Sequence, residues 1–163
     1  MKMPADVATL ATDIIKRLKA KGWTIAAAES CTGGLIAGAL TSIPGSSDAV
    51  YGGFVTYANE AKITMVGVPY GTLREFGAVS KEVAVAMAEG ALAAAGTHVA
   101  IAVTGIAGPD GGSAEKPVGL VHFALATMDA THHLRRNFNP GWTRDDIRHA
   151  AVIEALKLIA KSI

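Results

Sequence analysis

Apolar residues recur every three or four positions over residues 4–21, which predicts a helix with one buried stripe. Pro4 suits its first turn, and Gly22 ends it. Ser80 is the predicted N-cap of the longest uninterrupted helix, and Thr143 with Asp146 three residues later resembles a capping box. Further helices are predicted at 34–41, 60–66, 81–95 and 144–161, with a short helical piece around 72–76.

Apolar runs bounded by turn residues predict five strands, at 23–28, 51–57, 98–104, 118–128 and 131–138. Gly52 and Gly53 in the second strand indicate a bulge or a close approach of another segment. The last two strands are separated by Asp129 and Ala130 and should form a hairpin. Because strands alternate with helices over the first two thirds, we expect one α/β domain, residues 1–163. It should be a three-layer α/β/α sandwich on a mixed, mostly parallel sheet with at least one antiparallel strand.

Composition narrows the class of protein. A chain of 163 residues is long enough to bury a core as one domain. The net charge of +1 and the absence of a long Lys/Arg run argue against nucleic acid as a partner. No signal peptide and no apolar run of membrane-spanning length is present, so we expect a cytoplasmic protein without a membrane partner. The single cysteine, Cys31, excludes an internal disulfide, and the histidines form no metal-binding pattern, so no metal or cofactor is predicted.

Polar residues follow three of the predicted strands, at 29–34, 56–62 and 104–116. If the strands are parallel, their carboxyl ends meet at one edge of the sheet, which is where open α/β sheets bind ligands. The first segment carries an acid, two hydroxyls, a thiol and two glycines just before a predicted helix. It is either a nucleophile or anion site, or a tight turn with Ser or Thr as the helix N-cap.

Ser30 needs a base before it can act as a nucleophile, and no histidine is placed for that role. Lys62 is the better candidate because it lies on a short, otherwise apolar helix, with Asn59 as its expected N-cap. Burial would lower its pKa from the ordinary value of roughly 10.4. Tyr57 could relay a proton or orient Lys62. The alternatives are an exposed Lys62 and a Tyr57 that only packs at the edge of the core. Cys31 is either a second candidate nucleophile or a small buried thiol.

The glycine-rich loop at 105–112 lacks both common nucleotide fingerprints. It is either a long ligand-facing loop or a flexible connection. Arg144 and Arg148 lie one turn apart at the start of the last helix and could grip a phosphate. Alternatively, they are solvated charges paired with Asp145 or Asp146.

Six motifs together resemble the CinA C-terminal domain family. They are Ala-Glu-Ser-Cys-Thr-Gly-Gly-Leu-Ile-Ala (28–37), Pro-Gly-Ser-Ser (44–47), Gly-Phe-Val-Thr-Tyr-Ala-Asn-Glu-Ala-Lys (53–62), Gly-Ala-Val-Ser (77–80), Ala-Val-Thr-Gly-Ile-Ala-Gly-Pro-Asp-Gly-Gly (102–112) and Lys-Pro-Val-Gly (116–119). The resemblance covers nearly the whole chain. The chain looks like the stand-alone, PncC-type members of the family, which are nicotinamide-nucleotide amidases. It departs from them before the last helix, where Gly141-Trp142-Thr143-Arg144 replaces their usual Gly-Asp-Arg.

The resemblance implies hydrolysis of the carboxamide of nicotinamide mononucleotide, which yields nicotinate mononucleotide and ammonia, a salvage step toward NAD. It also implies a homo-oligomer without a metal or cofactor. Ser30 would be the nucleophile, Lys62 its base and Tyr57 an assisting group. Backbone N–H groups around residues 32–34 would stabilise the oxyanion. The residues expected to bind substrate are Glu29, Thr32, Gly33, Gly34, Thr104, Gly105, Gly108 and Arg144.

The function of Glu29 stays open at this stage. Its carboxylate could position Lys62 or hold the turn by accepting backbone N–H bonds. Two other functions also stay open: a non-catalytic nucleotide-binding or regulatory domain of the competence- and damage-associated CinA type, and an amidase or esterase for another small molecule.

Overall fold

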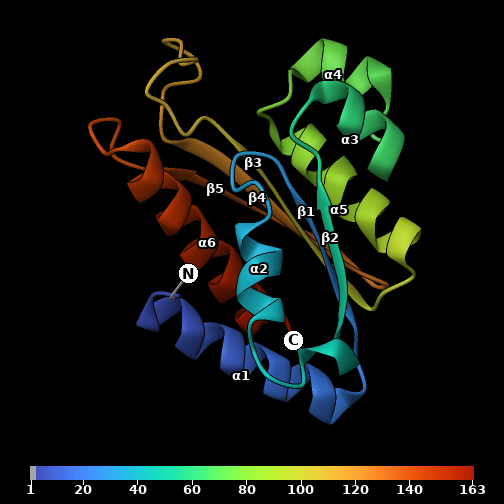
Figure 1. The fold of residues 1–163 in the computed structure, drawn as a ribbon. Helices are drawn as coiled ribbons and strands as arrows, with labels where there is room; N and C mark the ends of the chain where they lie inside the picture. Colours follow the sequence, from blue (N-terminus) through green and yellow to red (C-terminus); the bar gives the residue numbers. More distant parts are fainter. Residues whose placement is uncertain (1–2) are drawn as a thin grey trace.

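A computed structural model describes residues 3–163 as a five-stranded sheet with helices on both faces (Figure 1). The helices are α1 (Ala5–Lys21), α2 (Leu35–Thr41), α3 (Asn59–Val66), α4 (Tyr70–Phe76), α5 (Lys81–Ala95) and α6 (Arg144–Ser162), with a 3-10 turn, η1 (Ser46–Asp48). The strands are β1 (Ile25–Glu29), β2 (Val50–Val55), β3 (Val99–Gly105), β4 (Leu120–Thr127) and β5 (Thr131–Asn137). The predicted three-layer α/β/α fold is confirmed.

The strands lie in the order β2-β1-β3-β4-β5. β1 pairs in parallel with β2 and β3, whereas β4 runs antiparallel to both β3 and β5. Of the described strands, four therefore run in one direction and β4 runs against them, as the mostly parallel prediction requires. The hairpin of β4 and β5 is also confirmed. The carboxyl ends of β1, β2 and β3 meet at one edge, since Glu29 pairs with both Val55 and Val103.

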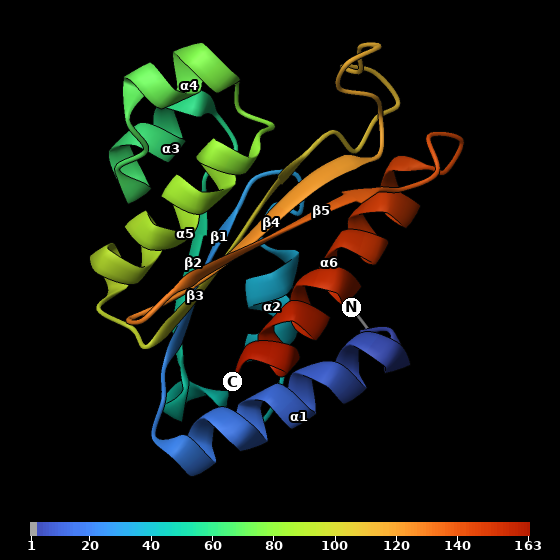
Figure 2. The ribbon, with the colours of Figure 1, turned by 180° about the vertical axis from the view of Figure 1, so that it is seen from behind.

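The sheet has a face of large side chains and a face of small ones. On β3, Ile101 and Val103 pack toward the layer formed by α1, α2 and α6, together with Phe123 and Leu125 of β4. The alternate positions are mostly alanines, which pack toward α3, α4 and α5. Figure 2 shows α5 lying along this second face, where short side chains allow a helix to approach the sheet closely. The apolar side of each helix thus packs into one of two cores, one on each face of the sheet.

Local signals in the sequence account for most helix ends. Gly22 ends α1 in a left-handed conformation, the Ser80 side chain caps α5, and Thr143 with Asp146 forms the expected capping box of α6. The helical piece around 72–76 is α4. The prediction for Asn59 is wrong: Ala58 is the N-cap of α3, and Asn59 is its first helical residue. The first strand begins at Ile25, two residues later than predicted, because the Trp23 N–H donates to the Leu18 carbonyl at the end of α1 rather than to the sheet.

The two glycines of β2 serve both expected purposes. The register with β1 shifts between Ile25 and Ala26, which skips Tyr51 and leaves a bulge beside Gly52. A Cβ atom at Gly53 would lie 2.6 Å from the Cβ of Ala37, so this position lets α2 pack directly on the strand. The contact at Gly53 thus brings α2 directly against β2.

Candidate active site

The three polar segments meet around one cavity of about 260 Å³ at the carboxyl edge of the parallel strands. Ser30 and Cys31 enter it from the turn after β1, Tyr57 and Lys62 from the segment after β2, and Thr104 to Gly108 from the end of β3. The ligand-facing interpretation of the glycine-rich loop is therefore supported, because residues 105–108 and 110–111 line this cavity.

Ser30 and Lys62 are in direct contact. Lys62 Nζ lies 3.1 Å from Ser30 Oγ, and Lys62 is only 1% exposed. The ammonium nitrogen also lies 2.8 Å from the carbonyl oxygen of Thr56 and 3.2 Å from that of Tyr57. Burial lowers the pKa of Lys62, in the direction that favours the neutral amine. The alternative of a solvent-exposed Lys62 is wrong.

Cys31 lines the same cavity, but its thiol is not activated as a nucleophile. Burial raises the pKa of its thiol to about 12, so the thiol stays protonated near neutral pH. The Lys62 amine contacts the hydroxyl of Ser30, and no hydrogen bond to the Cys31 sulfur is present among residues 3–163. The geometry favours Ser30 over Cys31 as the nucleophile.

Glu29 holds the start of α2. Its carboxylate accepts hydrogen bonds from the backbone N–H groups of Gly34 and Ile36 at one oxygen and of Ala37 at the other, at 2.8–3.1 Å. The expected Ser or Thr N-cap is wrong, since Gly34 is the N-cap and no side chain of the turn caps the helix. A buried carboxylate from the preceding strand performs this task, so the second of the two interpretations of Glu29 is the one the structure supports.

Arg148 holds the opposite side of the same turn. Its guanidinium donates to the carbonyl oxygens of Cys31 at 3.1 Å and Thr32 at 3.4 Å. The N–H of Gly33 donates to the Ser30 carbonyl, and that of Gly34 donates to Glu29. Within the part of the chain that the structure describes, the N–H groups of Cys31 and Thr32 have no acceptor. Of these two residues Cys31 lines the cavity, so its backbone donor is free to bind a ligand there, and the unpaired donor of Thr32 lies next to it in the chain.

Tyr57 and Arg144 form a bridge over the cavity. Arg144 donates to the carbonyl oxygen of Gly108 at 2.8 Å and to the Tyr57 hydroxyl at 3.3 Å. The Tyr57 side chain is 62% exposed, and only its backbone carbonyl contacts Lys62. Tyr57 therefore orients Lys62 through its main chain, whereas its ring lies at the mouth of the cavity.

The remaining predicted substrate-binding residues divide into two groups. Thr104 lines the cavity, where its hydroxyl donates to the carbonyl of Ala78, and Gly105 lies beside it. Thr32 and Gly33 do not line the cavity, although the Thr32 hydroxyl is buried without a hydrogen-bond partner among residues 3–163. A Cβ atom at Gly33 would lie 3.5 Å from the Arg148 guanidinium, at a left-handed φ of 60°.

Sequence reasoning missed several lining residues, of which Asn59, Val79 and Asp110 are the most informative. Asp110 lies in the predicted loop, so its position after β3 was the available signal. Val79 comes from the segment before α5, which no strand end marks. No group of histidine, cysteine, aspartate or glutamate side chains in the described residues could hold a metal ion. None of the helices in residues 3–163 is long and apolar enough to cross a membrane.

Comparison with known proteins assigns the family. The model of the CinA C-terminal domain matches residues 7–163. The chain is a CinA C-terminal domain protein. The crystal structure of the competence/damage inducible protein CihA from Agrobacterium tumefaciens superposes with a TM-score of 0.95, at 50% sequence identity over 99% of this chain and 98% of that chain.

Relatives with this CinA domain come in two sizes. The nicotinamide-nucleotide amidohydrolase PncC of Escherichia coli (strain K12) is 48% identical over 95% of this chain and 93% of its own length. A CinA-like protein of Synechococcus sp. (strain RCC307) is 49% identical over 95% of this chain, but the match covers only 37% of that protein. The chain thus spans little more than a third of the longer relatives and nearly all of the shorter one.

Proposed function

We propose that this chain is a nicotinamide-nucleotide amidase, which hydrolyses nicotinamide mononucleotide to nicotinate mononucleotide and ammonia with Ser30 as nucleophile and Lys62 as base. The observation that carries the mechanism is the 3.1 Å contact of Lys62 Nζ with Ser30 Oγ inside the cavity. The PncC relative of nearly equal length supports the substrate.

The surroundings of Lys62 fit a neutral amine that accepts a proton from Ser30. A neutral amine has two N–H bonds and one lone pair. The carbonyl oxygens of Thr56 and Tyr57 can accept both N–H bonds, which leaves the lone pair for the third neighbour, the Ser30 hydroxyl. Among residues 3–163 no carboxylate forms an ion pair with Lys62, and burial lowers its pKa. Ser–Lys pairs of this kind are a known variant of nucleophilic catalysis.

The reaction then proceeds in two balanced halves. Lys62 takes the proton of Ser30 while Ser30 Oγ forms a bond to the amide carbon. The protonated Lys62 donates that proton to the leaving nitrogen, so the C–N bond breaks and ammonia departs from an acyl-serine ester. Lys62 next removes a proton from water, which attacks the ester carbon. The acid leaves and the proton returns to Ser30 Oγ.

The oxyanion of each tetrahedral intermediate binds the free N–H group of Cys31, with that of Thr32 beside it. The residue that follows the nucleophile often supplies this donor in hydrolases with a strand-turn-helix nucleophile. One such donor contributes about 3 kcal/mol to transition-state stabilisation. The N–H groups of Gly33 and Gly34 are already used within the protein, so we assign them and Glu29 to the support of the turn.

The charged side chains around the cavity fit the two charges of the substrate. Besides Lys62, the lining residues with ionisable charge are Asp110 and Arg144. Nicotinamide mononucleotide carries a cationic pyridinium ring and an anionic phosphate. We assign the phosphate to Arg144, which lines the cavity, because Arg148 does not line it and donates to the carbonyls of the turn. We assign the cationic ring to the neighbourhood of Asp110, the lining carboxylate.

The test is ammonia release from nicotinamide mononucleotide by wild type and by Ser30→Ala, Lys62→Met and Cys31→Ala variants. We expect the first two variants to lose activity and Cys31→Ala, the matched neighbour, to keep it. Full activity in Ser30→Ala excludes the serine mechanism, and loss in Cys31→Ala alone assigns the nucleophile to the thiol. Binding without ammonia release in the wild type supports a non-catalytic domain instead.

We further propose that the protein is a homo-oligomer, following the family resemblance, and that it acts in the cytoplasm. The near-neutral charge of +1 is consistent with a small-molecule substrate and no nucleic acid partner. Light scattering on the purified protein tests the oligomer, and a monomer over the working range of concentration excludes it. Cell fractionation tests the compartment.

A further inference from the structure

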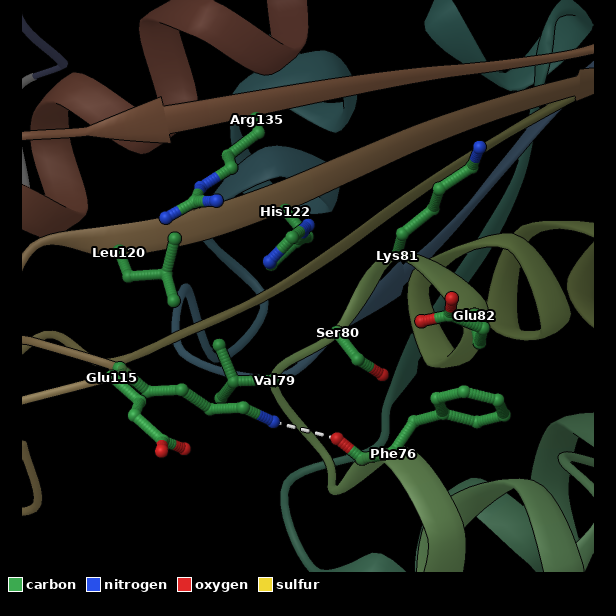
Figure 3. A pocket seen from close by; sticks show the side chains of 10 residues that line it. Phe76, Val79, Ser80, Lys81, Glu82, Glu115, Leu120, His122 and Arg135 are labelled. Carbon is green, nitrogen blue, oxygen red and sulfur yellow. Dashed lines mark hydrogen bonds between the residues drawn. The ribbon is translucent and has the colours of Figure 1, made fainter. Parts of the chain in front are cut away.

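A second cavity of about 300 Å³ lies outside the catalytic one, between the start of α5 and the strands β4 and β5 (Figure 3). The two cavities share one lining residue, Val79. The second cavity contains no group used in the proposed reaction. Its lining side chains nevertheless include three cations, two carboxylates and a buried histidine.

The cations reach this cavity from three separate parts of the chain. Lys81 begins α5, Lys116 belongs to the loop before β4, and Arg135 lies on β5 directly across from His122 of β4. None of the three forms an ion pair with a carboxylate among residues 3–163. The Lys116 ammonium donates to the carbonyl oxygen of Phe76, which keeps it at the wall of the cavity.

The start of α5 adds unused backbone donors to the same wall. The Ser80 hydroxyl accepts from the N–H of Val83, and the Ser80 carbonyl accepts from Ala84. The N–H groups of Lys81 and Glu82 therefore remain without an intrahelical acceptor, as the first N–H groups of a helix do. This 15-residue helix also directs the positive end of its dipole toward the cavity.

His122 is a buried histidine on the wall of this cavity. Its ring is 8% exposed, its Nδ1 lies 2.9 Å from Nε2 of His133, and its other nitrogen has no partner among residues 3–163. Its pKa falls to about 4, first because of burial and then because of the positive charges of His133, Arg135 and Lys116. The carboxylate of Glu82 opposes this shift but does not cancel it. The lining carries three cationic side chains, Lys81, Lys116 and Arg135, against the two carboxylates of Glu82 and Glu115, so positive charge is in excess by one.

We propose that this second cavity binds the phosphate group of a small phosphate monoester. Arg135, Lys116 and the free N–H groups at the start of α5 bind the phosphate oxygens. Phe76, Val79 and Leu120 provide an apolar surface for the rest of the molecule. In Figure 3, His122 and Arg135 lie on one side of Ser80 and the Phe76 ring lies on the other, below Glu82.

Phenyl phosphate and inorganic phosphate are the probes, because a phenoxy group in the first replaces one hydroxyl of the second; both are compared at a pH where both are dianions. The signals of the His122 ring are followed by NMR while each probe is added at constant ionic strength, adjusted with chloride. Bound phosphate should raise the pKa of His122, since a nearby anion stabilises the imidazolium form. Phenyl phosphate should bind more tightly than inorganic phosphate because of its contact with Phe76.

The variants separate this cavity from the catalytic one. Arg135→Gln should weaken phenyl phosphate binding about ten-fold, which is the effect of losing one charge-assisted hydrogen bond. Arg136→Gln is the matched control, because Arg136 is the next residue on β5 and instead pairs with Glu154 of α6. Arg144→Gln, in the catalytic cavity, should leave the response of His122 unchanged.

Three results would overturn the proposal. The first is a His122 signal that responds equally to chloride and to phosphate, which indicates screening by salt alone. The second is equal binding by wild type and Arg135→Gln. The third is loss of binding in Arg144→Gln but not in Arg135→Gln, which would place the phosphate in the catalytic cavity. Thermal unfolding of each variant confirms that the compared proteins are folded.

Discussion

Substituting Glu29 with glutamine tests the proposed architecture of the nucleophile turn most directly. Glu29 is 1% exposed and accepts three backbone N–H groups at the start of α2. Glutamine has nearly the same shape but only one acceptor oxygen and no charge. Its amide oxygen can replace the oxygen that accepts from Gly34 and Ile36, and its NH₂ group must then face the N–H of Ala37, so that two donors oppose each other.

The cost of Glu29→Gln follows from these contacts. Each of the two retained bonds weakens by about 1 kcal/mol when its acceptor loses the charge. The Ala37 N–H is left buried without an acceptor, which costs about 1–3 kcal/mol. Loss of the anion at the positive end of the α2 dipole adds about 0.5 kcal/mol. The free energy of unfolding should therefore fall by about 4 kcal/mol, and Tm by about 10 °C.

Urea unfolding at neutral pH measures this change, with Glu75→Gln as the matched control. Glu75 is an exposed glutamate on α4, so its substitution should change the free energy of unfolding by less than about 0.5 kcal/mol. Amidase activity, assayed where Glu29→Gln is still folded, should also fall, because the turn holds Ser30 and the two free N–H groups. A loss of stability below about 1 kcal/mol with full activity would refute this account of the turn.

Three further predictions concern the groups around that turn. The kcat/KM for nicotinamide mononucleotide should rise with pH as Lys62 loses its proton, with a midpoint below the usual lysine value of about 10.4, because burial lowers its pKa. A pH–rate profile measures this. Arg148→Lys should lower kcat about ten-fold with little change in KM, because one ammonium cannot hold both turn carbonyls as the guanidinium does. Gly90→Ala should lower the free energy of unfolding by about 3 kcal/mol, because the new Cβ would lie 1.7 Å from the carbonyl oxygen of Val66. It should also reduce activity, because this clash displaces α3, the helix that carries Lys62.

Each of these predictions has a contrary outcome. A flat profile across the range below pH 10 would mean that Lys62 is not the base. A rise in KM at unchanged kcat in Arg148→Lys would instead give Arg148 a function in binding the substrate phosphate. Gly38→Ala is the control for Gly90→Ala, since a Cβ atom at this helical glycine of α2 meets nothing within 4 Å. Equal stability of the two glycine variants would contradict the packing argument.

The sequence by itself determined the elements and their order. Helical periodicity, the capping box of Thr143 and Asp146, the Ser80 cap and the stop at Gly22 all act over a few residues, so they are readable without a structure. The alternation of strands and helices also predicted the direction of β1, β2 and β3. That direction was enough to bring the three polar segments to one edge of the sheet.

The partners of individual side chains were decided only by the tertiary structure. Sequence signals suggested a capping side chain for α2 within the turn, but the N-cap is Gly34 and the side chain that accepts the free N–H groups is that of Glu29, five to eight residues away. Arg148 was a candidate for phosphate binding and instead contacts carbonyls 116 and 117 residues away. Lys62 and Ser30 were paired through chemistry and family resemblance, whereas their 3.1 Å contact depends on how α3 packs against α5 and β2.

The physical reason is the range of the interactions involved. Caps, turns and periodic apolar faces depend on residues that are close together in the sequence, so the sequence alone reveals them. Three other features depend on segments from several elements that meet only in the folded protein. They are the burial that lowers the pKa of Lys62, the two unpaired N–H groups beside Ser30, and the second cavity at the start of α5. Those meetings are set by sheet register and by close packing at positions such as Gly90, which sits inside a helical pattern with no local signal for its contact with Val66; at Gly53 the sequence indicated a close approach but not its partner, Ala37.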